Sequence, residues 1–309
     1  MKTDFKSKLE LVRYYSDEEN CKKLLAQQRW GNSPACPHCG NAGKIYTTNR
    51  GYKCGEPTCH KKFTVITKTI FENTKIPLNK WFEAIFVISA HKKGISSHQL
   101  GRDIAVSQKT AWFILHRVRE MLADNAPELL DGMVEADETY VGGKVSNQHK
   151  KKREKSDKKF SPLSGKTPVF GLLERGGKVY NQVIPQPNRP IVSNMVLANV
   201  ATTAKLVTDA SSLYPQLAGT YEHHVVNHHQ GEYVRGFVYT NGIENYWSHL
   251  KRGINGIYHH VAPKHLHRYC NEFSYRFNTR KIKDVDRFTI VLARCEGRLK
   301  WTQLVAKPD

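Results

Sequence analysis

The chain has 309 residues, of which 39% are hydrophobic and 25% are charged. This composition excludes wholesale disorder, and no run of about 20 apolar residues predicts a membrane span. Lysine and arginine number 48 against 28 aspartates and glutamates, which gives a formal net charge of +20 at pH 7. Such an excess of positive charge predicts a polyanionic partner, with nucleic acid first and an anionic membrane surface second.

Residues 1–30 predict a short helical segment with Ser16 or Asp17 as its N-cap. The chain start lacks the apolar run of a secretory signal. Seven cysteines are too few for a disulfide scaffold and suit a reducing compartment. We therefore expect a cytoplasmic protein, associated with the nucleoid if it binds DNA.

Residues 31–72 predict a zinc ribbon. Two cysteine pairs are spaced as CxxC and CxxxxC, and they comprise Cys36, Cys39, Cys54 and Cys59. Pairs about fifteen residues apart, with strand-like runs around them, are typical of a tetrahedral four-thiolate site. Because no coordination position stays open, the Zn²⁺ is expected to be structural and to supply most of this small domain's folding free energy. His38 and His60 lie beside the pairs and are alternative ligands.

Residues 73–128 show helical periodicity that fits a helix-turn-helix. Ser96 is expected to cap a short helix, the chain to turn near Val106, and Ser107 to cap a second helix. The second helix offers side chains suited to base edges and phosphates, namely Gln108, Lys109, Thr110, His116 and Arg117. An ordinary helical bundle is the alternative interpretation, although the neighbouring ribbon and the net charge favour DNA binding.

From residue 129 onward strand-like segments alternate with helices, which predicts an α/β domain with three notable acids. Asp137 and Asp209 lie on two different strands, while Glu244 begins a helix whose Lys251 follows two turns later on the same face. Carboxylates from two strands and a helix suit a two-metal phosphoryl-transfer site with Mg²⁺ or Mn²⁺, so their oxygens should approach a common point. Taken singly, Asp209 and Glu244 are better explained as an N-cap or a surface charge than as metal ligands.

Three sequence blocks carry a resemblance to a known family: VEADETYVGGK, LVTDASSLY and the long block from VNHHQGEYV to NTR, which contains NGIENYWSHLKRG. Together with the CPHCG of the ribbon, they resemble bacterial insertion-sequence transposases of the ISXO-like type. The resemblance implies a DDE catalytic domain with an RNase H-like fold over residues 129–309. It assigns the three catalytic, cation-binding acids to Asp137, Asp209 and Glu244, and the basic residue seven positions later to Lys251.

The activity that the resemblance implies is metal-dependent DNA strand cleavage and strand transfer at the terminal inverted repeats of an insertion sequence. Double-stranded DNA is then the partner, with Lys251 and Arg252 near its phosphates; a homo-oligomer is expected in the DNA complex, and no membrane partner. Two alternatives stay open, a non-enzymatic DNA-binding regulator derived from a transposase and a structure-selective nuclease of the same fold. The three acids with Lys251 favour an enzyme over the regulator.

Two further features have no assigned role. The basic segment 144–166 carries seven lysines or arginines within residues 150–159, and is interpreted either as a solvated loop or as a DNA contact. Nine of the fifteen histidines fall within residues 223–267. Phosphate-contacting or core histidines explain this cluster better than a metal site does. His228, which precedes the third acid, is the histidine most suited to a role in the site.

Overall fold

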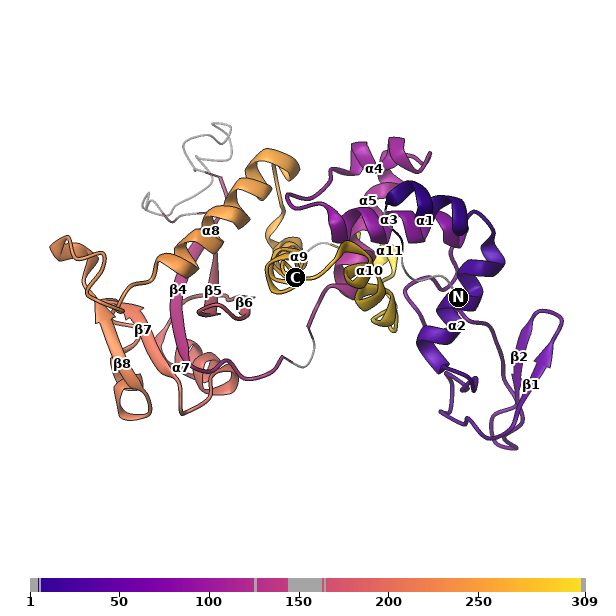
Figure 1. The fold of residues 1–309 in the computed structure, drawn as a ribbon, viewed down its shortest axis with the longest axis horizontal. Coiled ribbons are helices and arrows are strands. Elements are labelled where there is room, and N and C mark those ends of the chain that lie inside the picture. Colours follow the sequence, from indigo (N-terminus) through magenta and orange to yellow (C-terminus); the bar gives the residue numbers. More distant parts are fainter. Residues whose placement is uncertain (1–4, 6, 125–126, 144–162, 164, 307–309) are drawn as a thin grey trace. The chain divides into compact units, whose positions relative to one another are not determined.

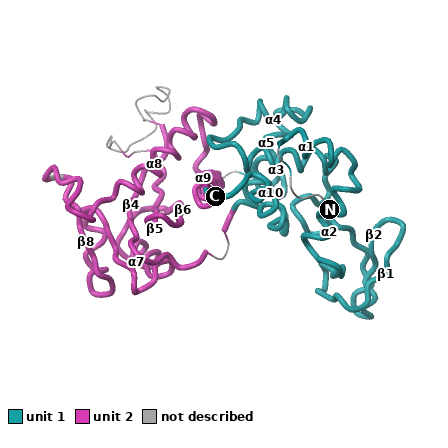
Figure 2. The backbone as a smooth tube through the Cα atoms, viewed as in Figure 1, with its two compact units in different colours: residues 1–122, 281–309 teal, residues 123–280 magenta. Residues whose placement is uncertain are grey.

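The computed structural model describes residues 5, 7–124, 127–143, 163 and 165–306. The chain divides into two compact units, one of residues 1–122 with 281–309 and the other of residues 123–280 (Figure 2). Most of the predicted basic segment, residues 144–162 and 164, lies outside the described residues. No helix in the described ranges is both long and apolar enough to cross a membrane.

The predicted N-terminal helical segment consists of two helices, α1 (Lys8–Tyr14) and α2 (Glu18–Trp30). The Asp17 side chain accepts a hydrogen bond from the backbone N–H of Glu19 at 3.0 Å, which satisfies a helix-end donor that otherwise has no partner. The predicted N-cap at Asp17 is therefore confirmed.

The ribbon that follows is a three-stranded antiparallel sheet in the order β1-β2-β3. Its strands are β1 (Ile45–Thr48), β2 (Gly51–Cys54) and β3 (Lys62–Phe63). The Trp30 ring packs edge-on against Tyr52 and Phe63, with ring centroids 5.3 and 5.9 Å apart. Gly51 has a φ of 132°, and a Cβ there would lie 2.6 Å from the Phe63 carbonyl oxygen, so the turn between β1 and β2 requires glycine.

Three helices follow the ribbon: α3 (Leu78–Ala90), α4 (Ser97–Asp103) and α5 (Gln108–Met121). The Ser96 hydroxyl accepts a hydrogen bond from the Gln99 N–H at 3.1 Å. The Ser107 hydroxyl accepts one from the Thr110 N–H at 3.2 Å. Both predicted caps, and with them the starts of α4 and α5, are confirmed.

The end of the chain returns to the first unit through α10 (Asp284–Ala293) and α11 (Trp301–Val305). Phe288 of α10 packs against Phe82 of α3 at 5.6 Å between ring centroids, and Trp301 of α11 packs against Trp112 of α5 at 5.8 Å. Residues 281–306 thus contribute to the core of the helical unit, whereas the sequence analysis placed them in the domain of residues 129–309. Contacts between segments so distant in sequence leave no local pattern, which explains the difference.

The second unit is built on a five-stranded mixed sheet in the order β6-β5-β4-β7-β8. Its strands are β4 (Met133–Val141), β5 (Thr167–Glu174), β6 (Val179–Val183), β7 (Lys205–Asp209) and β8 (Glu222–Val226). β4, β5 and β6 pair antiparallel, while β7 runs parallel to both β4 and β8. The predicted α/β class of this region is confirmed.

Helices cover both faces of this sheet (Figure 1). They are α7 (Arg189–Asn199), α8 (Asn241–Gly253) and α9 (Leu266–Asn278). Shorter helical turns span Pro215–Gly219, His228–Gln230, Ile254–Tyr258 and Pro263–His265. Val192 and Val196 of α7 share a core with Ala136 of β4, while α8 and α9 share a core with Val141 of the same strand. Alternate residues of β4 therefore face opposite helical layers.

Candidate functional site

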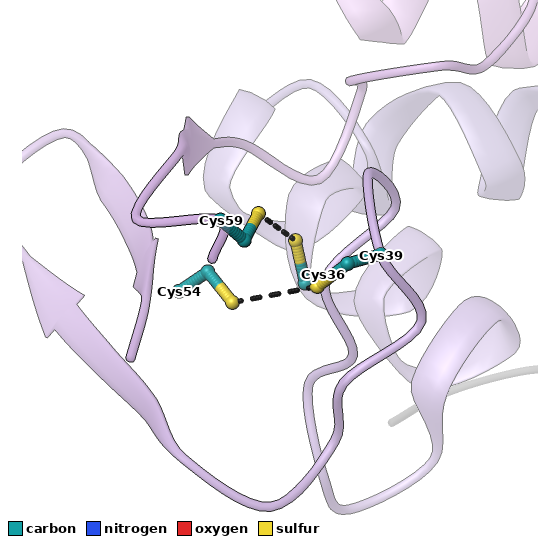
Figure 3. Close-up of side chains that lie close together, drawn as sticks. All are labelled: Cys36, Cys39, Cys54 and Cys59. Carbon is teal, nitrogen blue, oxygen red and sulfur yellow. Dashed lines mark hydrogen bonds between the residues drawn. The ribbon is translucent and has the colours of Figure 1, made fainter. Parts of the chain in front are cut away.

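The four predicted zinc ligands lie together in the ribbon (Figure 3). The Sγ atoms of Cys36 and Cys59 are 3.8 Å apart, those of Cys39 and Cys54 are 3.6 Å apart, and all four lie within 4.8 Å of one another. Four sulfurs at about 2.3 Å from a tetrahedral Zn²⁺ are about 3.8 Å apart, so the donor set fits structural zinc. The cluster includes neither His38 nor His60.

The environment of Cys36 favours a zinc-binding thiolate. Burial raises the pKa of its thiol, but hydrogen bonds from the backbone N–H groups of His38 and Cys39 and from neighbouring thiols outweigh burial and lower the pKa to about 7. Zinc binds the deprotonated thiol. The backbone N–H groups of the loop between Cys36 and Cys39 therefore favour zinc binding by stabilising the thiolate.

The first two predicted acids lie on neighbouring parallel strands of the second unit. β4 and β7 pair in register through Ala136 and Thr208, so Asp137 and Asp209 are the next residue on each strand. Residues that are level on adjacent strands point to the same face of a sheet. Asp209 ends β7, and its Oδ1 accepts a hydrogen bond from the Ser211 N–H at 3.1 Å.

The Asp137 carboxylate accepts a hydrogen bond from a tryptophan of α8. The Trp247 Nε1–H donates to Asp137 Oδ2 at 3.0 Å. Gly171 lies opposite Asp137 on β5, and a Cβ at this glycine would lie 2.5 Å from the Trp247 ring. The missing side chain at Gly171 therefore leaves the space through which the indole reaches the carboxylate. Sequence reasoning placed Trp247 in the apolar stripe of α8 and missed this contact.

The electrostatics at Asp137 favour a cation. Burial, together with the negative charges of Asp209 and Glu244, raises the pKa of Asp137 to about 7, although hydrogen bonds oppose the shift. The neighbouring Glu138 side chain, on the opposite face of β4, also has its pKa raised to about 7, mainly by burial. An acid whose charge is disfavoured by burial and by other acids is stabilised when a cation binds beside it.

Glu244, the third predicted acid, lies in the first turn of α8 with half of its side chain exposed. Its Oε1 is 3.4 Å from His228 Nε2 and accepts a hydrogen bond from the Thr240 hydroxyl at 3.3 Å. Among the residues that the structure describes, the four cysteines are the only group of three or more potential ligands that is close enough to hold a metal ion. The structure thus pairs Asp137 with Asp209 on one face but does not gather Glu244 with them.

A buried glutamate that the sequence analysis did not assign fixes the start of α8. Glu135 is fully buried, and its Oε2 accepts the Ile243 N–H at 2.9 Å, which satisfies a donor in the first turn of the helix. A Cβ at Gly242 would lie 2.7 Å from this same oxygen, so glycine permits the close approach. Glu135 thereby positions the residue that follows Ile243, which is Glu244.

Arg175 completes this arrangement from the end of β5. Its Nε lies 2.6 Å from Glu135 Oε1, and its other nitrogens donate to the carbonyls of Phe237 and Tyr239 at 2.6 Å. The guanidinium also lies 3.6 Å from the centroid of the Tyr239 ring. One arginine therefore ties the strand that carries Asp137 to the segment that leads into α8. The acid at position 135, on the same face of β4 as Asp137, was the available signal.

The predicted DNA contacts on α5 divide into exposed and buried residues. Gln108 and Lys109 are exposed, and Thr110 is half-buried. Arg117 is only 6% exposed, and its guanidinium donates to the carbonyls of Ile70 at 2.7 Å and Leu299 at 3.0 Å. His116 is fully buried. Arg117 and His116 face the core of the helical unit, which corrects their expected role as DNA contacts; Lys251 and Arg252 on α8 are exposed.

Two family models match the chain. One, described as the ISXO2-like transposase domain, matches residues 129–278, and the other, described as the transposase zinc-ribbon domain, matches residues 16–62. These two regions contain the carboxylates of the second unit and the cysteines of the first.

Individual relatives agree with these matches. An uncharacterized protein in transposable element ISH50 of Halobacterium salinarum is 29% identical over 277 residues, covering 86% of this chain and 92% of that protein. An uncharacterized transposase-like protein of Haemophilus influenzae is 28% identical over 107 residues, covering 34% and 85%. A crystal structure of a pre-cleavage Mos1 transpososome covers 74% of this chain and 82% of its own at 12% identity, but its TM-score of 0.20 is too low to bear on the fold. The resemblance found in the sequence is confirmed: the chain belongs to the ISXO2-like insertion-sequence transposases that carry an N-terminal zinc ribbon.

Proposed function

We propose that this protein cleaves DNA strands at the ends of an insertion sequence and joins them to target DNA in a reaction that requires a divalent cation. The observation that carries the proposal is the pairing of Asp137 and Asp209 on neighbouring parallel strands, beneath the helix that carries Glu244. Carboxylates on strands and an overlying helix suit the in-line displacement of phosphodiester oxygens.

The donor set fits Mg²⁺ or Mn²⁺, which prefer hard oxygen ligands. Asp137, Asp209 and Glu244 would hold the cations, with Glu244 exchanging its contacts to His228 and Thr240 for the cation. Bound cations would activate the attacking hydroxyl and stabilise the leaving 3′-oxygen. The pKa of Asp137, raised by burial and by the charges of the other two acids, supports this assignment.

The chain's own residues would supply orientation and charge. The indole N–H of Trp247 directs the Asp137 carboxylate, and Glu135 fixes the first turn of α8 beneath Glu244. Lys251 lies seven residues after Glu244 on the same face of α8 and is exposed, so it would bind a DNA phosphate close to the acids. Arg252 would add a second phosphate contact.

The fold of the second unit supports an RNase H-like assignment. A mixed five-stranded sheet, with helices on both faces and two acids level with each other on its neighbouring parallel strands, is the arrangement that this assignment requires. In the first unit, the capped helices α4 and α5 and the exposed Gln108 and Lys109 support a helix-turn-helix that reads the element ends. A homo-oligomer on DNA completes the proposal, because two ends must be joined.

The test separates DNA binding from chemistry in the full-length protein. Asp137→Asn keeps the side-chain volume but removes a carboxylate, so gel-shift affinity for labelled element ends should persist while Mg²⁺-dependent joining to plasmid falls by at least about 100-fold. Glu128→Gln, which changes an exposed acid paired with Lys178, is the control and should keep full activity.

Each other outcome identifies an alternative function. Full joining by Asp137→Asn would remove this residue from the site. Wild-type protein that binds the ends without cutting them would favour a DNA-binding regulator. Cleavage without joined products would favour a nuclease of the same fold.

A further inference from the structure

The segment of residues 227–240, which leads from β8 into α8, presents large side chains to solvent. Tyr233 is 64% exposed, Val234 54% and Phe237 47%. These three residues, here called the 233–237 patch, lie within five positions of one another in a strongly basic chain. Exposed apolar side chains that gather in one place mark a binding surface more often than scattered ones do.

The patch is carried by a defined turn. Gly231 adopts a left-handed conformation with a φ of 75° after the short helical turn His228–Gln230. The Glu232 carboxylate accepts the Asn227 N–H at 3.0 Å, and the Arg235 guanidinium donates to the Val225 carbonyl at 3.0 Å. Exposure of the patch is therefore a property of the folded segment.

The patch lies directly beside the carboxylate site. The Tyr233 ring centroid is 5.4 Å from that of His228, whose Nε2 is 3.4 Å from Glu244 Oε1. At the other end, the Phe237 carbonyl accepts a hydrogen bond from Arg175, which pairs with Glu135. Both ends of the patch thus contact residues that hold or position Glu244.

We propose that the 233–237 patch binds an unpaired DNA base next to the reacting phosphate, with the Tyr233 ring stacked on the base. This inference rests on the proposed strand-transfer function, which brings a DNA end to Glu244. Every base has a π-face, and stacking on an aromatic side chain stabilises binding by about 1–3 kcal/mol per base.

The charges around the patch favour DNA as its occupant over a second protein. Arg235 pairs with Glu232 at 3.5 Å but keeps a side chain 61% exposed, and Lys251 and Arg252 are exposed on the helix that carries Glu244. Aromatic rings set among cations are the combination that binds single-stranded nucleic acid, whereas the core of a protein–protein interface is depleted of charge.

The experiment uses the full-length protein and a synthetic duplex of about 30 base pairs with about five unpaired nucleotides at one end. A 2-aminopurine at the junction reports stacking by its fluorescence quench, and a fully paired duplex of the same sequence is the reference. The variants are Tyr233→Ala, Tyr233→Phe and, as control, Leu197→Ala, which changes a residue 49% exposed on α7.

Tyr233→Ala should lose the quench and about 5- to 150-fold in affinity for the unpaired end, which is the stacking energy converted at 1.4 kcal/mol per tenfold. Its affinity for the fully paired duplex should not change. Tyr233→Phe should restore both the quench and the affinity because it keeps the ring. Leu197→Ala should behave as the wild type.

Wild-type quench and affinity in Tyr233→Ala would overturn the inference. So would a Tyr233→Ala protein whose mass in sedimentation differs from that of the wild type without DNA, because the patch would then join two copies of the chain. The proposed function fails separately: it fails if the wild type joins no ends, whether or not Tyr233 quenches the probe.

Discussion

The two candidate metal sites of this chain differ in how complete they are without a metal. In the ribbon, the four sulfurs of the two cysteine pairs lie within 4.8 Å of one another. In the sheet unit, Asp137 and Asp209 are neighbours, but Glu244 is held by His228 and Thr240. Neutral thiols approach one another without penalty, whereas carboxylates repel one another in a buried site. The ribbon is therefore preorganised for its ion, whereas the proposed catalytic site would assemble only when its cations bind.

The largest expected effect is that of zinc removal, which tests whether the ion holds the ribbon folded. Chelation, or Cys39→Ser, should unfold residues 31–72, because the binding free energy of structural zinc, about 10–16 kcal/mol, is folding free energy for a domain this small. Hydrogen exchange should show loss of amide protection in β1 and β2 while β4 and β7 stay protected. Persistent protection of β2 after chelation would show that the aromatic contacts of Trp30 suffice to hold the ribbon.

The same contrast explains what the sequence predicts well and what it does not. Cys36 and Cys39 are three positions apart, so local spacing alone predicts their convergence, and the caps at Ser96 and Ser107 are equally local. Asp137 and Asp209 are 72 positions apart, and only the parallel pairing of their strands makes them neighbours. The roles proposed for them rest on the family resemblance, because an acid at the end of β7, or one of three acids on β4, has several explanations.

Other contacts had no sequence signal that distinguishes them from ordinary core residues. Trp247 reads as part of the apolar stripe of α8, and its hydrogen bond to Asp137 depends on a glycine 76 positions earlier. The sequence predicts Arg117 as a DNA contact because arginine is rarely buried. In the structure its guanidinium is buried and donates hydrogen bonds to two backbone carbonyls from distant segments. Long-range hydrogen bonds of this kind follow from the fold and not from residue type.

The pH dependence of stability tests the carboxylate site of the sheet unit through proton binding at Asp137. Burial raises its pKa to about 7 from an unfolded value near 4, so the native state binds more protons across this range. Without divalent cations, the free energy of unfolding should therefore fall as pH rises from 4 to 7. At pH 8, Asp137→Asn should be about 1–3 kcal/mol more stable than the wild type, with no difference below pH 4.

Added Mg²⁺ should narrow this difference, because it stabilises the wild-type carboxylate and has less to bind in Asp137→Asn. Unfolding of the sheet unit, followed by hydrogen exchange in β4, measures the effect. A metal-free Asp137→Asn that is less stable than the wild type at pH 8 would show that the fold already compensates the Asp137 charge.

Trp247→Phe tests the single hydrogen bond between the indole of α8 and the Asp137 carboxylate. Phenylalanine keeps a ring over Gly171 but removes the N–H that directs Asp137 Oδ2. Loss of a contact that orients a metal ligand typically costs about 10- to 100-fold, so joining and Mn²⁺ affinity should both weaken by that factor while gel-shift affinity is unchanged. A reduced joining rate that recovers at high Mn²⁺ would identify Trp247 as a positioning residue. Equal activity of Trp247→Phe and wild type would leave the indole a packing role only.

The smallest expected effect is that of changing Lys251, which tests whether α8 binds a DNA phosphate beside the three acids. Lys251→Ala should reduce the slope of log affinity against log salt by about 0.9, the value for one phosphate contact on duplex DNA, and should leave the unfolding of the sheet unit unchanged because the side chain is exposed. Lys178→Ala is the matched control, since that lysine pairs with Glu128 at the turn between β5 and β6. Gel shifts across a salt series measure both. An equal slope in Lys251→Ala and wild type would mean that phosphate reaches the acids by another route, and Lys251 would then have no part in the proposed site.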